Sequence, residues 1–214
     1  QTIEATLSKR KTNLLPKQAS IFTTNYDLFV ERASEECPSI ILNDGFNRVP
    51  QLRGSPKFAS EKLFDATMHT GNLYDYRAEL ASINLIKMHG SMSWQKSNGD
   101  IVFKIIDFAS LSMINEDDSE ARKNFLLSTA IVLPTLRKHQ QTIIERTYYD
   151  LLRIFANVMD RENTLLIAFG FSFRDEHILC VIEIVEKQKN KTISCCGCTA
   201  FRPFLVVNSD FNKR

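Results

Sequence analysis

The stretch "IFTTNYDLFVERA", residues 21–33, joins a strand directly to a helix. Its first four residues are apolar or β-branched, which favours a strand inside a sheet. From Leu28 to Ala33 the apolar residues have the spacing of an amphipathic helix. Between the two elements, Asn25 and Asp27 place an amide and a carboxylate where the strand ends. The stretch therefore predicts an α/β fold, and it leaves open whether these side chains cap the helix or face a ligand.

The same alternation of strands and helices continues along the chain. Further strands are expected at residues 39–42, 83–88, 100–106, 130–135, 164–173 and 204–209, and further helices at 119–130, 140–164 and 175–188. Residues 46–70 are rich in Gly, Pro, Ser and Arg, which predicts irregular structure. Strands of continuous apolar sequence, alternating with helices, predict a mostly parallel sheet covered on both faces. This arrangement is a Rossmann-like, three-layer α/β/α fold.

The composition is that of a soluble globular protein. The chain has 214 residues, of which 43% are hydrophobic and 24% charged, so we expect a single domain over residues 1–214. The net charge is only +2 and no basic block stands out, which argues against direct nucleic-acid binding. No apolar run approaches the ~20 residues of a membrane span, and the first residues lack a signal-peptide core. We therefore expect a cytoplasmic protein that does not associate with membranes.

The five cysteines do not form a disulfide framework. Three of them, Cys195, Cys196 and Cys198, are crowded into "CCGC", and the total is odd. Reduced thiols in a cytoplasm explain this pattern most simply. Metal binding by the cluster is the alternative, but no second Cys/His pair lies at zinc-finger spacing, and structural zinc takes four ligands. The sequence therefore predicts no metal site.

Polar side chains gather at the ends of three predicted strands. One cluster ends the strand before Asp27, one surrounds His89, and one follows the strand that ends at Gly170. In an open parallel sheet, ligands bind at the carboxyl ends of the strands, so we expect the three clusters to meet at one edge. The candidate site residues are Thr23, Thr24, Asn25, Asp27, His89, Gly90, Ser91, Gly170, Ser172, Asp175 and His177.

Each cluster also has a purely structural explanation. Asn25 and Asp27 are residue types that cap helices. His89 is explained equally well as a satisfied histidine at a strand end, with Gly90 supplying a tight turn. Asp175 suits the first turn of a helix, where the helix dipole favours a carboxylate. Only the occurrence of all three clusters at strand ends of one sheet favours a ligand site.

The three clusters resemble the motifs of sirtuins. "TTNYD" is similar to the Asn-x-Asp strand end beside the nicotinamide ribose, and "KMHGS" to the element with the catalytic histidine. "AFGFSFRDEHI" is similar to the strand end that contacts the adenosine half of NAD. The combined spelling is closer to the sirtuin-like NADases of bacterial anti-phage defence than to protein deacylases. Within these NADases it most resembles the subunits that pair with a HerA-type ATPase, and the resemblance covers roughly residues 19–184.

This resemblance implies a reaction and a role for each clustered residue. The implied reaction cleaves NAD+ to nicotinamide and ADP-ribose, so NAD+ is the substrate. Asn25 would bond the ribose hydroxyls or position a water, and Asp27 would stabilise developing positive charge. His89, with an ordinary pKa near ~6.5, would act as the general base. The remaining residues are implied to contact NAD+: Thr23, Thr24, Gly90, Ser91, Gly170, Ser172, Asp175 and His177.

Two other functions stay open. Deacylase sirtuins carry a four-cysteine zinc module between the His-Gly and Gly-x-Ser elements, whereas residues 91–169 contain no cysteine. This absence favours an NADase without zinc over a deacylase. The other alternative is an NAD-sensing or scaffold subunit of an ATPase complex with little catalysis of its own. A homo-oligomer is also expected, because the helix carrying Tyr148, Tyr149 and Phe155 has apolar residues on more than one face; burial of that helix within one domain is the alternative.

One element of the family is missing before the first cluster. The family has a Gly-rich loop whose backbone N–H groups hold the pyrophosphate, and it should precede Thr23. The sequence has no Gly before Gly45. We therefore expect either a fragment or a chain with omitted segments, or else a protein that binds NAD in another way.

Overall fold

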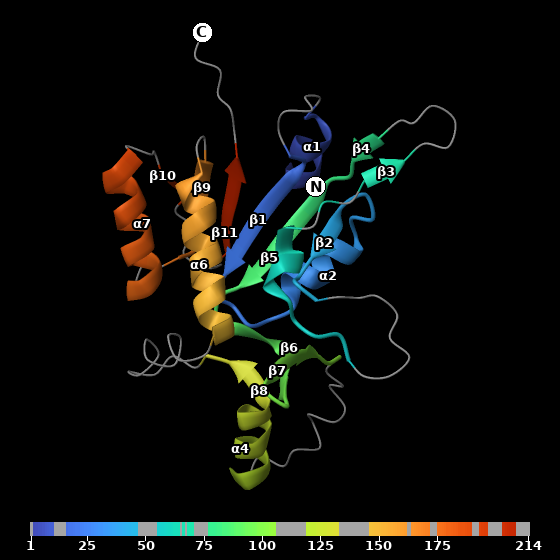
Figure 1. The fold of residues 1–214 in the computed structure, drawn as a ribbon, viewed down its shortest axis with the longest axis vertical. Helices are drawn as coiled ribbons and strands as arrows, with labels where there is room; N and C mark the ends of the chain where they lie inside the picture. Colours follow the sequence, from blue (N-terminus) through green and yellow to red (C-terminus); the bar gives the residue numbers. More distant parts are fainter. Residues whose placement is uncertain are drawn as a thin grey trace.

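A computed structural model describes residues 2–10, 16–46, 55–64, 66, 68–70, 77–105, 119–132, 146–161, 164–171, 175–189, 193–196 and 203–208. These residues form a six-stranded sheet with helices on both faces, and a smaller antiparallel sheet at one end of it (Figure 1). The helices within these ranges are not long and apolar enough to cross a membrane.

Five of the six described strands of the central sheet run in the same direction, so their carboxyl ends share one edge. Its strands are β1 (Gln18–Thr23), β2 (Ile41–Asn43), β5 (Ser82–Lys87), β9 (Thr164–Phe169), β10 (Ile193–Cys196) and β11 (Pro203–Asn208). The order across the sheet is β10-β9-β11-β1-β5-β2. Strand β1 pairs in parallel with β5, and β11 runs antiparallel to both β1 and β9. Since β1 and β9 both oppose β11, they run in the same direction. The predicted α/β fold with a mostly parallel sheet is confirmed.

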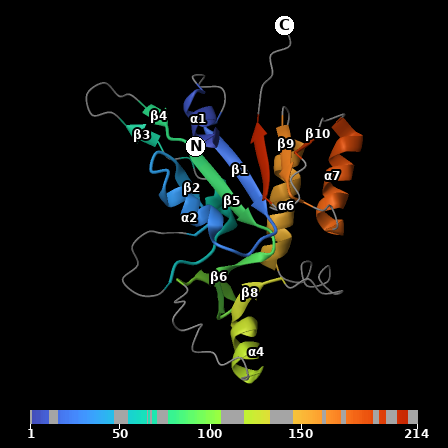
Figure 2. The same ribbon diagram turned by 180° about the vertical axis from the view of Figure 1, so that it is seen from behind.

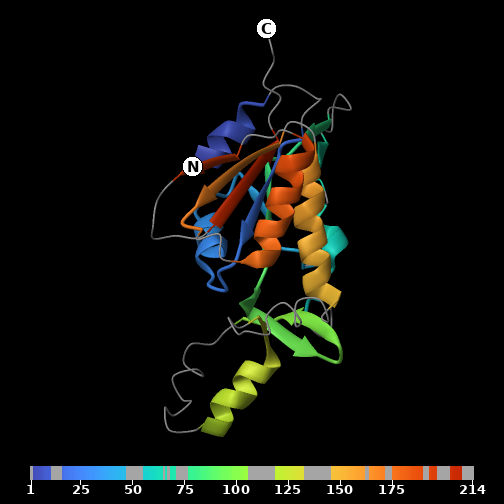
Figure 3. The same cartoon turned by 90° about the vertical axis from the view of Figure 1, so that its left-hand side faces the viewer.

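Two hydrophobic layers hold the helices to the sheet. The helices are α1 (Thr2–Ser8), α2 (Phe29–Glu35), η1 (Ser60–Phe64), α6 (Arg146–Asp160) and α7 (Glu176–Lys189). Successive residues of a strand point to opposite faces, so Phe22 of β1 contacts the core under α6 and α7, whereas Ile21 contacts the core under α1. Figure 3 shows the strands of the sheet between α1 and α2 on one side and α6 and α7 on the other.

A second, smaller sheet follows directly from the histidine motif. It contains β6 (Gly90–Ser97), β7 (Asp100–Phe103) and β8 (Thr129–Ile131), in the order β7-β6-β8, and α4 (Ser119–Ser128) leads into β8. The turn between β6 and β7 has positive φ at Asn98 and Gly99, which matches the twist of a tight hairpin. A separate pair of strands, β3 (Met68–Thr70) and β4 (Arg77–Glu79), forms its own two-stranded sheet.

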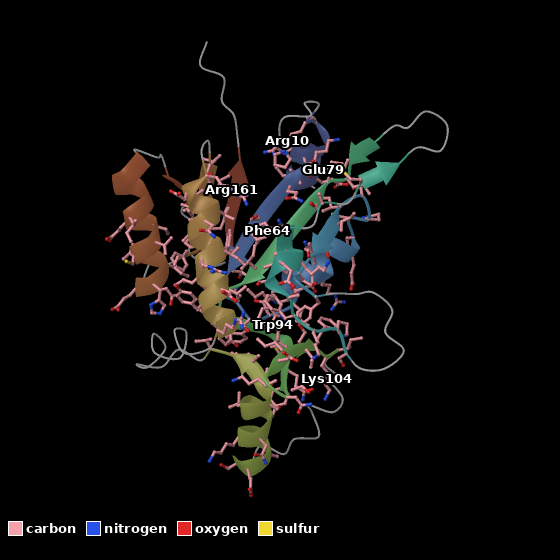
Figure 4. The ribbon with its side chains drawn as sticks, in the orientation of Figure 1. Arg10, Phe64, Glu79, Trp94, Lys104 and Arg161 are labelled. Carbon is pink, nitrogen blue, oxygen red and sulfur yellow. The ribbon has the colours of Figure 1, made fainter. Side chains whose placement is uncertain are left out.

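An aromatic cluster joins the small sheet to the loop after β2. Phe46 lies edge-on to Phe58, Trp94 and Phe103, with ring centroids 5.4 to 5.7 Å apart. Figure 4 shows Trp94 where the small sheet meets the end of the central sheet. The expectation that residues 46–70 are irregular is wrong in part, since η1 and β3 lie within them. Burial of the aromatic side chains stabilises this region, which its Gly- and Pro-rich composition did not indicate.

The two final strands differ from the expected elements. Strand β10 was not predicted: "ISCC" pairs in parallel with β9, because its residues are small, apolar or β-branched despite the two cysteines. Strand β11 was predicted as a strand, but it is antiparallel and lies between β1 and β9 (Figure 2). The expected strand at 130–135 is shorter and covers Thr129–Ile131, and residues 133–145 lie outside the described ranges.

The long amphipathic helix α6 is mostly buried within the domain. Tyr148 and Phe155 are almost completely buried in the core, whereas Tyr149 is 51% exposed. Burial therefore explains two of the three aromatic residues that suggested an oligomer. Self-association stays a prediction.

Candidate active site

Backbone hydrogen bonds hold the end of β1 against the histidine motif. The N–H of Met88 donates to the carbonyl of Thr23 at 2.8 Å, which extends the parallel pairing by one residue. Beyond it, the N–H of Met92 donates to the carbonyl of Tyr26 at 2.9 Å. These bonds bring residues 23–27, at the end of β1, beside residues 87–92, at the end of β5.

Two side chains from the end of β5 add further hydrogen bonds to the same segment. The ring of His89 donates from Nδ1 to the carbonyl of Thr24 at 3.1 Å. The ammonium group of Lys87 donates to the carbonyl of Asp27. Four carbonyls of residues 23–27 thus accept hydrogen bonds from residues 87–92. Thr23 and Thr24 are themselves buried, so the backbone of this segment is fixed on its inner side.

Asn25 differs from its neighbours because its side chain is not used to hold the segment. Its backbone N–H donates to Thr23 Oγ1 at 3.1 Å. Within the described residues its side-chain amide makes no hydrogen bond, and the residue is half-buried. A fixed backbone that carries an amide without a protein partner is suited to binding a ligand.

The carboxylate of Asp27, unlike the side-chain amide of Asn25, accepts a hydrogen bond within the described part of the chain. Its Oδ1 accepts a hydrogen bond from the backbone N–H of Phe29 at 3.1 Å, at the first residue of α2. This contact forms a local turn before α2. The N-cap residue of α2 is Leu28 and the helix has no side-chain N-cap hydrogen bond, so the expected capping role of Asp27 is not confirmed. Asp27 is half-buried, so this contact leaves it partly accessible.

The hydrogen bond from His89 determines which ring nitrogen can act as a base. A carbonyl oxygen only accepts hydrogen bonds, so the contact with Thr24 requires the proton on Nδ1. In the neutral ring, Nε2 then carries the lone pair. This Nε2 lies 3.8 Å from Oδ1 of Asp175, the residue just before α7. When Nε2 takes a proton, the Asp175 carboxylate is close enough to stabilise the imidazolium as an ion pair.

Gly90 is required by packing of the backbone. Its φ is +79°, and a Cβ atom at this position would lie 1.8 Å from the carbonyl oxygen of Ala130 and 3.0 Å from the hydroxyl of Tyr148. The N–H of Val132 also donates to the carbonyl of His89 at 2.9 Å. Strand β8 therefore lies directly against the histidine motif and fixes its backbone.

The remaining predicted site residues differ in whether the structure places them at this site. Ser91 is completely buried, and its hydroxyl lies 3.1 Å from that of Ser93, so the structure turns it into the small sheet. Gly170 ends β9 with a φ of +56°, and the half-buried His177 lies in the first turn of α7. Ser172 lies outside the described residues. The structure therefore brings Asn25, Asp27, His89 and Asp175 together, and it directs Ser91 elsewhere.

The described residues include no group of three or more His, Cys, Asp or Glu side chains that could hold a metal ion. Cys195 and Cys196 lie on β10, and Cys198 lies outside the described ranges.

A charged pair that the sequence patterns did not predict lies beside this site. Lys87 is only 2% exposed, and its Nζ lies 2.8 Å from Oε1 of Glu31 in α2. The sequence contains one indication of this pair. A lysine stands near the end of the apolar run "INLIKMHG", where an unpaired buried charge would be very costly. A buried lysine in a strand predicts a nearby carboxylate, and α2 supplies it.

The environment of Glu31 changes the acidity of its carboxyl group. Burial raises the pKa of Glu31 above its ordinary value of 4.5, while the ammonium group of Lys87 opposes the rise and the carboxylate of Asp44 adds to it. Glu31 therefore holds its proton more tightly in the folded chain than in the unfolded chain. Its contribution to stability is fully present below pH 4.5 and is lost as the pH rises through the raised pKa.

We expect this titration to appear as a pH-dependent difference between the wild type and Glu31→Gln. The glutamine does not titrate, so the stability of the wild type should fall relative to that of the variant as the pH rises from 4.5 through the raised pKa. Urea unfolding of both proteins across this range measures the difference. A difference that does not change with pH would contradict the raised pKa.

One comparison with known proteins places the chain in a family. A family model described as "SIR2-like domain" matches residues 19–195, which include all four residues that converge at the site. No curated protein matches the chain.

Proposed function

The chain belongs to the SIR2-like family, and on this premise we propose that it is an NAD+ glycohydrolase. SIR2-like domains bind NAD+. The proposed reaction cleaves the bond between nicotinamide and ribose and adds water to the ribose. The products are nicotinamide, ADP-ribose and one proton.

One observation carries this proposal. The segment at the end of β1 has four carbonyls engaged by residues 87–92, yet within the described part of the chain the amide of Asn25 has no protein partner. This amide stands next to Thr24, whose carbonyl holds the ring of His89. A preorganised hydrogen-bonding group beside a general base is an arrangement suited to cleavage of the nicotinamide–ribose bond.

Each converging residue has a step that suits its chemistry. Nicotinamide leaves as a neutral group, so positive charge develops on the ribose, as in other glycosyl transfers. The amide of Asn25 bonds a ribose hydroxyl or the attacking water, and the carboxylate of Asp27 stabilises the developing positive charge. Nε2 of His89 accepts the proton released by the water or hydroxyl. The carboxylate of Asp175, 3.8 Å away, stabilises the imidazolium that results.

Replacing Asn25 with alanine is the direct test. We expect Asn25→Ala to lower the kcat for nicotinamide release by about 10²-fold, because a preorganised hydrogen bond to the reacting sugar is lost. The matched control is Asn98→Gly, which removes an amide from the exposed turn between β6 and β7 and keeps its positive φ. Chromatography of NAD+, nicotinamide and ADP-ribose, without any peptide present, measures the reaction.

The same measurement separates the alternative functions. Nicotinamide release without peptide supports an NADase, whereas release only with an acyl-lysine peptide supports a deacylase. NAD+ binding without turnover supports a sensing or scaffold subunit. The absence of cysteine from residues 91–169 favours the first outcome. An Asn25→Ala variant with wild-type turnover would remove Asn25 from the mechanism.

We further propose a biological setting for this activity. The motif spelling supports a role in anti-phage defence by depletion of NAD+, with the chain acting as a homo-oligomer beside a HerA-type ATPase. Measurement of cellular NAD+ during phage infection, in cells that carry the wild type and in cells that carry Asn25→Ala, tests the role in defence.

A further inference from the structure

Lys87 and Glu31 form a charged pair in an unusual place. Lys87 is the last residue of β5, is 2% exposed, and precedes His89 by two positions. Glu31 lies in the first turn of α2, the helix that begins just after Asp27. Taking a lysine and a glutamate out of water costs several kcal/mol per ion, and their mutual attraction often does no more than offset this cost. A well-packed apolar pair would fill the same space without it, so stability alone is a poor explanation.

The contacts of Lys87 connect the two parts of the site. Its Nζ lies 2.8 Å from Glu31 Oε1, and it also donates to the backbone carbonyl of Asp27. One ammonium group therefore fixes both the end of the 23–27 segment and the first turn of α2. Asn25 lies within that segment, between carbonyls held by His89 and by Lys87.

The pair also has a consequence for the charge beside the site. The nicotinamide ring of NAD+ is cationic, and the ribose becomes cationic as the bond breaks. An unpaired ammonium group next to Asp27 would oppose both charges. Glu31 offsets this repulsion, because its Oε1 lies 2.8 Å from the ammonium group of Lys87. The Lys87–Glu31 pair thus provides the hydrogen bond of a lysine without its net charge.

We propose that Lys87 and Glu31 are positioning residues, which hold the 23–27 segment so that Asn25 meets the ribose in the transition state. This proposal rests on the proposed function. Neither residue is assigned contact with the substrate; both act through the backbone of Asp27 and the start of α2. Loss of the pair should therefore affect the chemical step more than binding of NAD+.

The first test does not depend on activity. Hydrogen exchange is measured in the full-length protein for the wild type, Lys87→Met, and Lys57→Met as matched control. Lys57 forms an ion pair of similar length, 2.7 Å, with Asp100, but this pair is exposed. We expect the amides of Phe29 and Arg32, at the start of α2, to exchange at least about tenfold faster in Lys87→Met only. Unchanged exchange at these amides would overturn the proposal.

The second test separates positioning from stability. We expect Lys87→Met and Glu31→Gln each to lower kcat by about tenfold or more, with KM changed less than about threefold. Lys87→Arg should recover most of the lost kcat, because it keeps the cation and its donors. A destabilised control, Leu7→Ala, removes a fully buried side chain from the core under α1.

The outcomes distinguish this inference from the function on which it rests. If the wild type releases no nicotinamide, the proposed function fails and hydrogen exchange alone decides whether the pair holds the segment. If the wild type is active but Lys87→Met keeps its kcat, the positioning role fails. It fails equally if Leu7→Ala loses as much kcat as Glu31→Gln, since the loss would then follow stability. Glu31→Gln keeps the shape of the side chain, so it provides a result even if Lys87→Met does not fold.

Discussion

The His89→Asn variant is expected to fold normally and to lose about 10²- to 10⁴-fold in kcat for nicotinamide release, the range in which general bases contribute. The side-chain amide of asparagine can still donate a hydrogen bond to the carbonyl of Thr24, as Nδ1 of His89 does at 3.1 Å. It offers no basic nitrogen in place of Nε2. The variant therefore removes the proposed base while it keeps the contact that holds the segment.

Two comparisons make this prediction specific. His89→Ala removes both the base and the hydrogen bond, so it should lower the midpoint of urea unfolding as well as kcat. His89→Asn should lower kcat alone. Single-turnover nicotinamide release at a fixed pH and urea unfolding provide the two readouts. A His89→Asn enzyme with more than half of the wild-type kcat would show that another group accepts the proton.

Replacing Gly90 with alanine is expected to cause the largest loss of stability, about 4 kcal/mol in the free energy of unfolding. Two effects add. The φ of +79° is unfavourable for alanine, and the new methyl group would lie 1.8 Å from the carbonyl oxygen of Ala130, which belongs to the backbone of β8 and cannot move aside alone. The strand that supports His89 would have to shift, so activity should fall with stability.

Gly99 offers a matched control for this substitution. Its φ of +82° is nearly the same, but a Cβ atom there has no neighbour within 4 Å. Gly99→Ala should therefore show the conformational cost of a positive φ alone, about 1 kcal/mol. Fluorescence of Trp94, the single tryptophan of the chain, follows urea unfolding of both variants. Equal losses in the two variants would mean that contact with Ala130 contributes nothing.

Much of the fold could be predicted because its elements carry strong local patterns. The strand-to-helix stretch that begins at Ile21 and the helix that contains Tyr148 have the apolar spacing that their structures require. The parallel pairing of β1 with β5 follows from strands that alternate with helices. The direction of β11 could not be predicted, since an apolar strand has the same sequence pattern whether its neighbours are parallel or antiparallel to it.

The candidate site was predictable in its location and less so in its contacts. The common edge of β1, β5 and β9 follows from topology, so Asn25, His89 and Asp175 could be grouped from sequence. The sequence did not indicate that Asp175 faces His89, because that contact depends on how α7 packs. Ser91 was grouped with these residues because it follows His89 closely. However, β6 is buried on both faces at this point. The sequence pattern therefore does not show to which face the hydroxyl of Ser91 points.

The position of β11 has a consequence for how the protein is made. Strands β1 and β5, which end just before Asn25 and His89, do not pair directly with β9, which ends just before Gly170; β11 joins the two groups. A ribosome must therefore complete residues 203–208 before the nascent chain can close its sheet. Until then no strand joins the two groups. We therefore expect the edge of the sheet that gathers Asn25, His89 and Asp175 to be among the last parts of the fold to form.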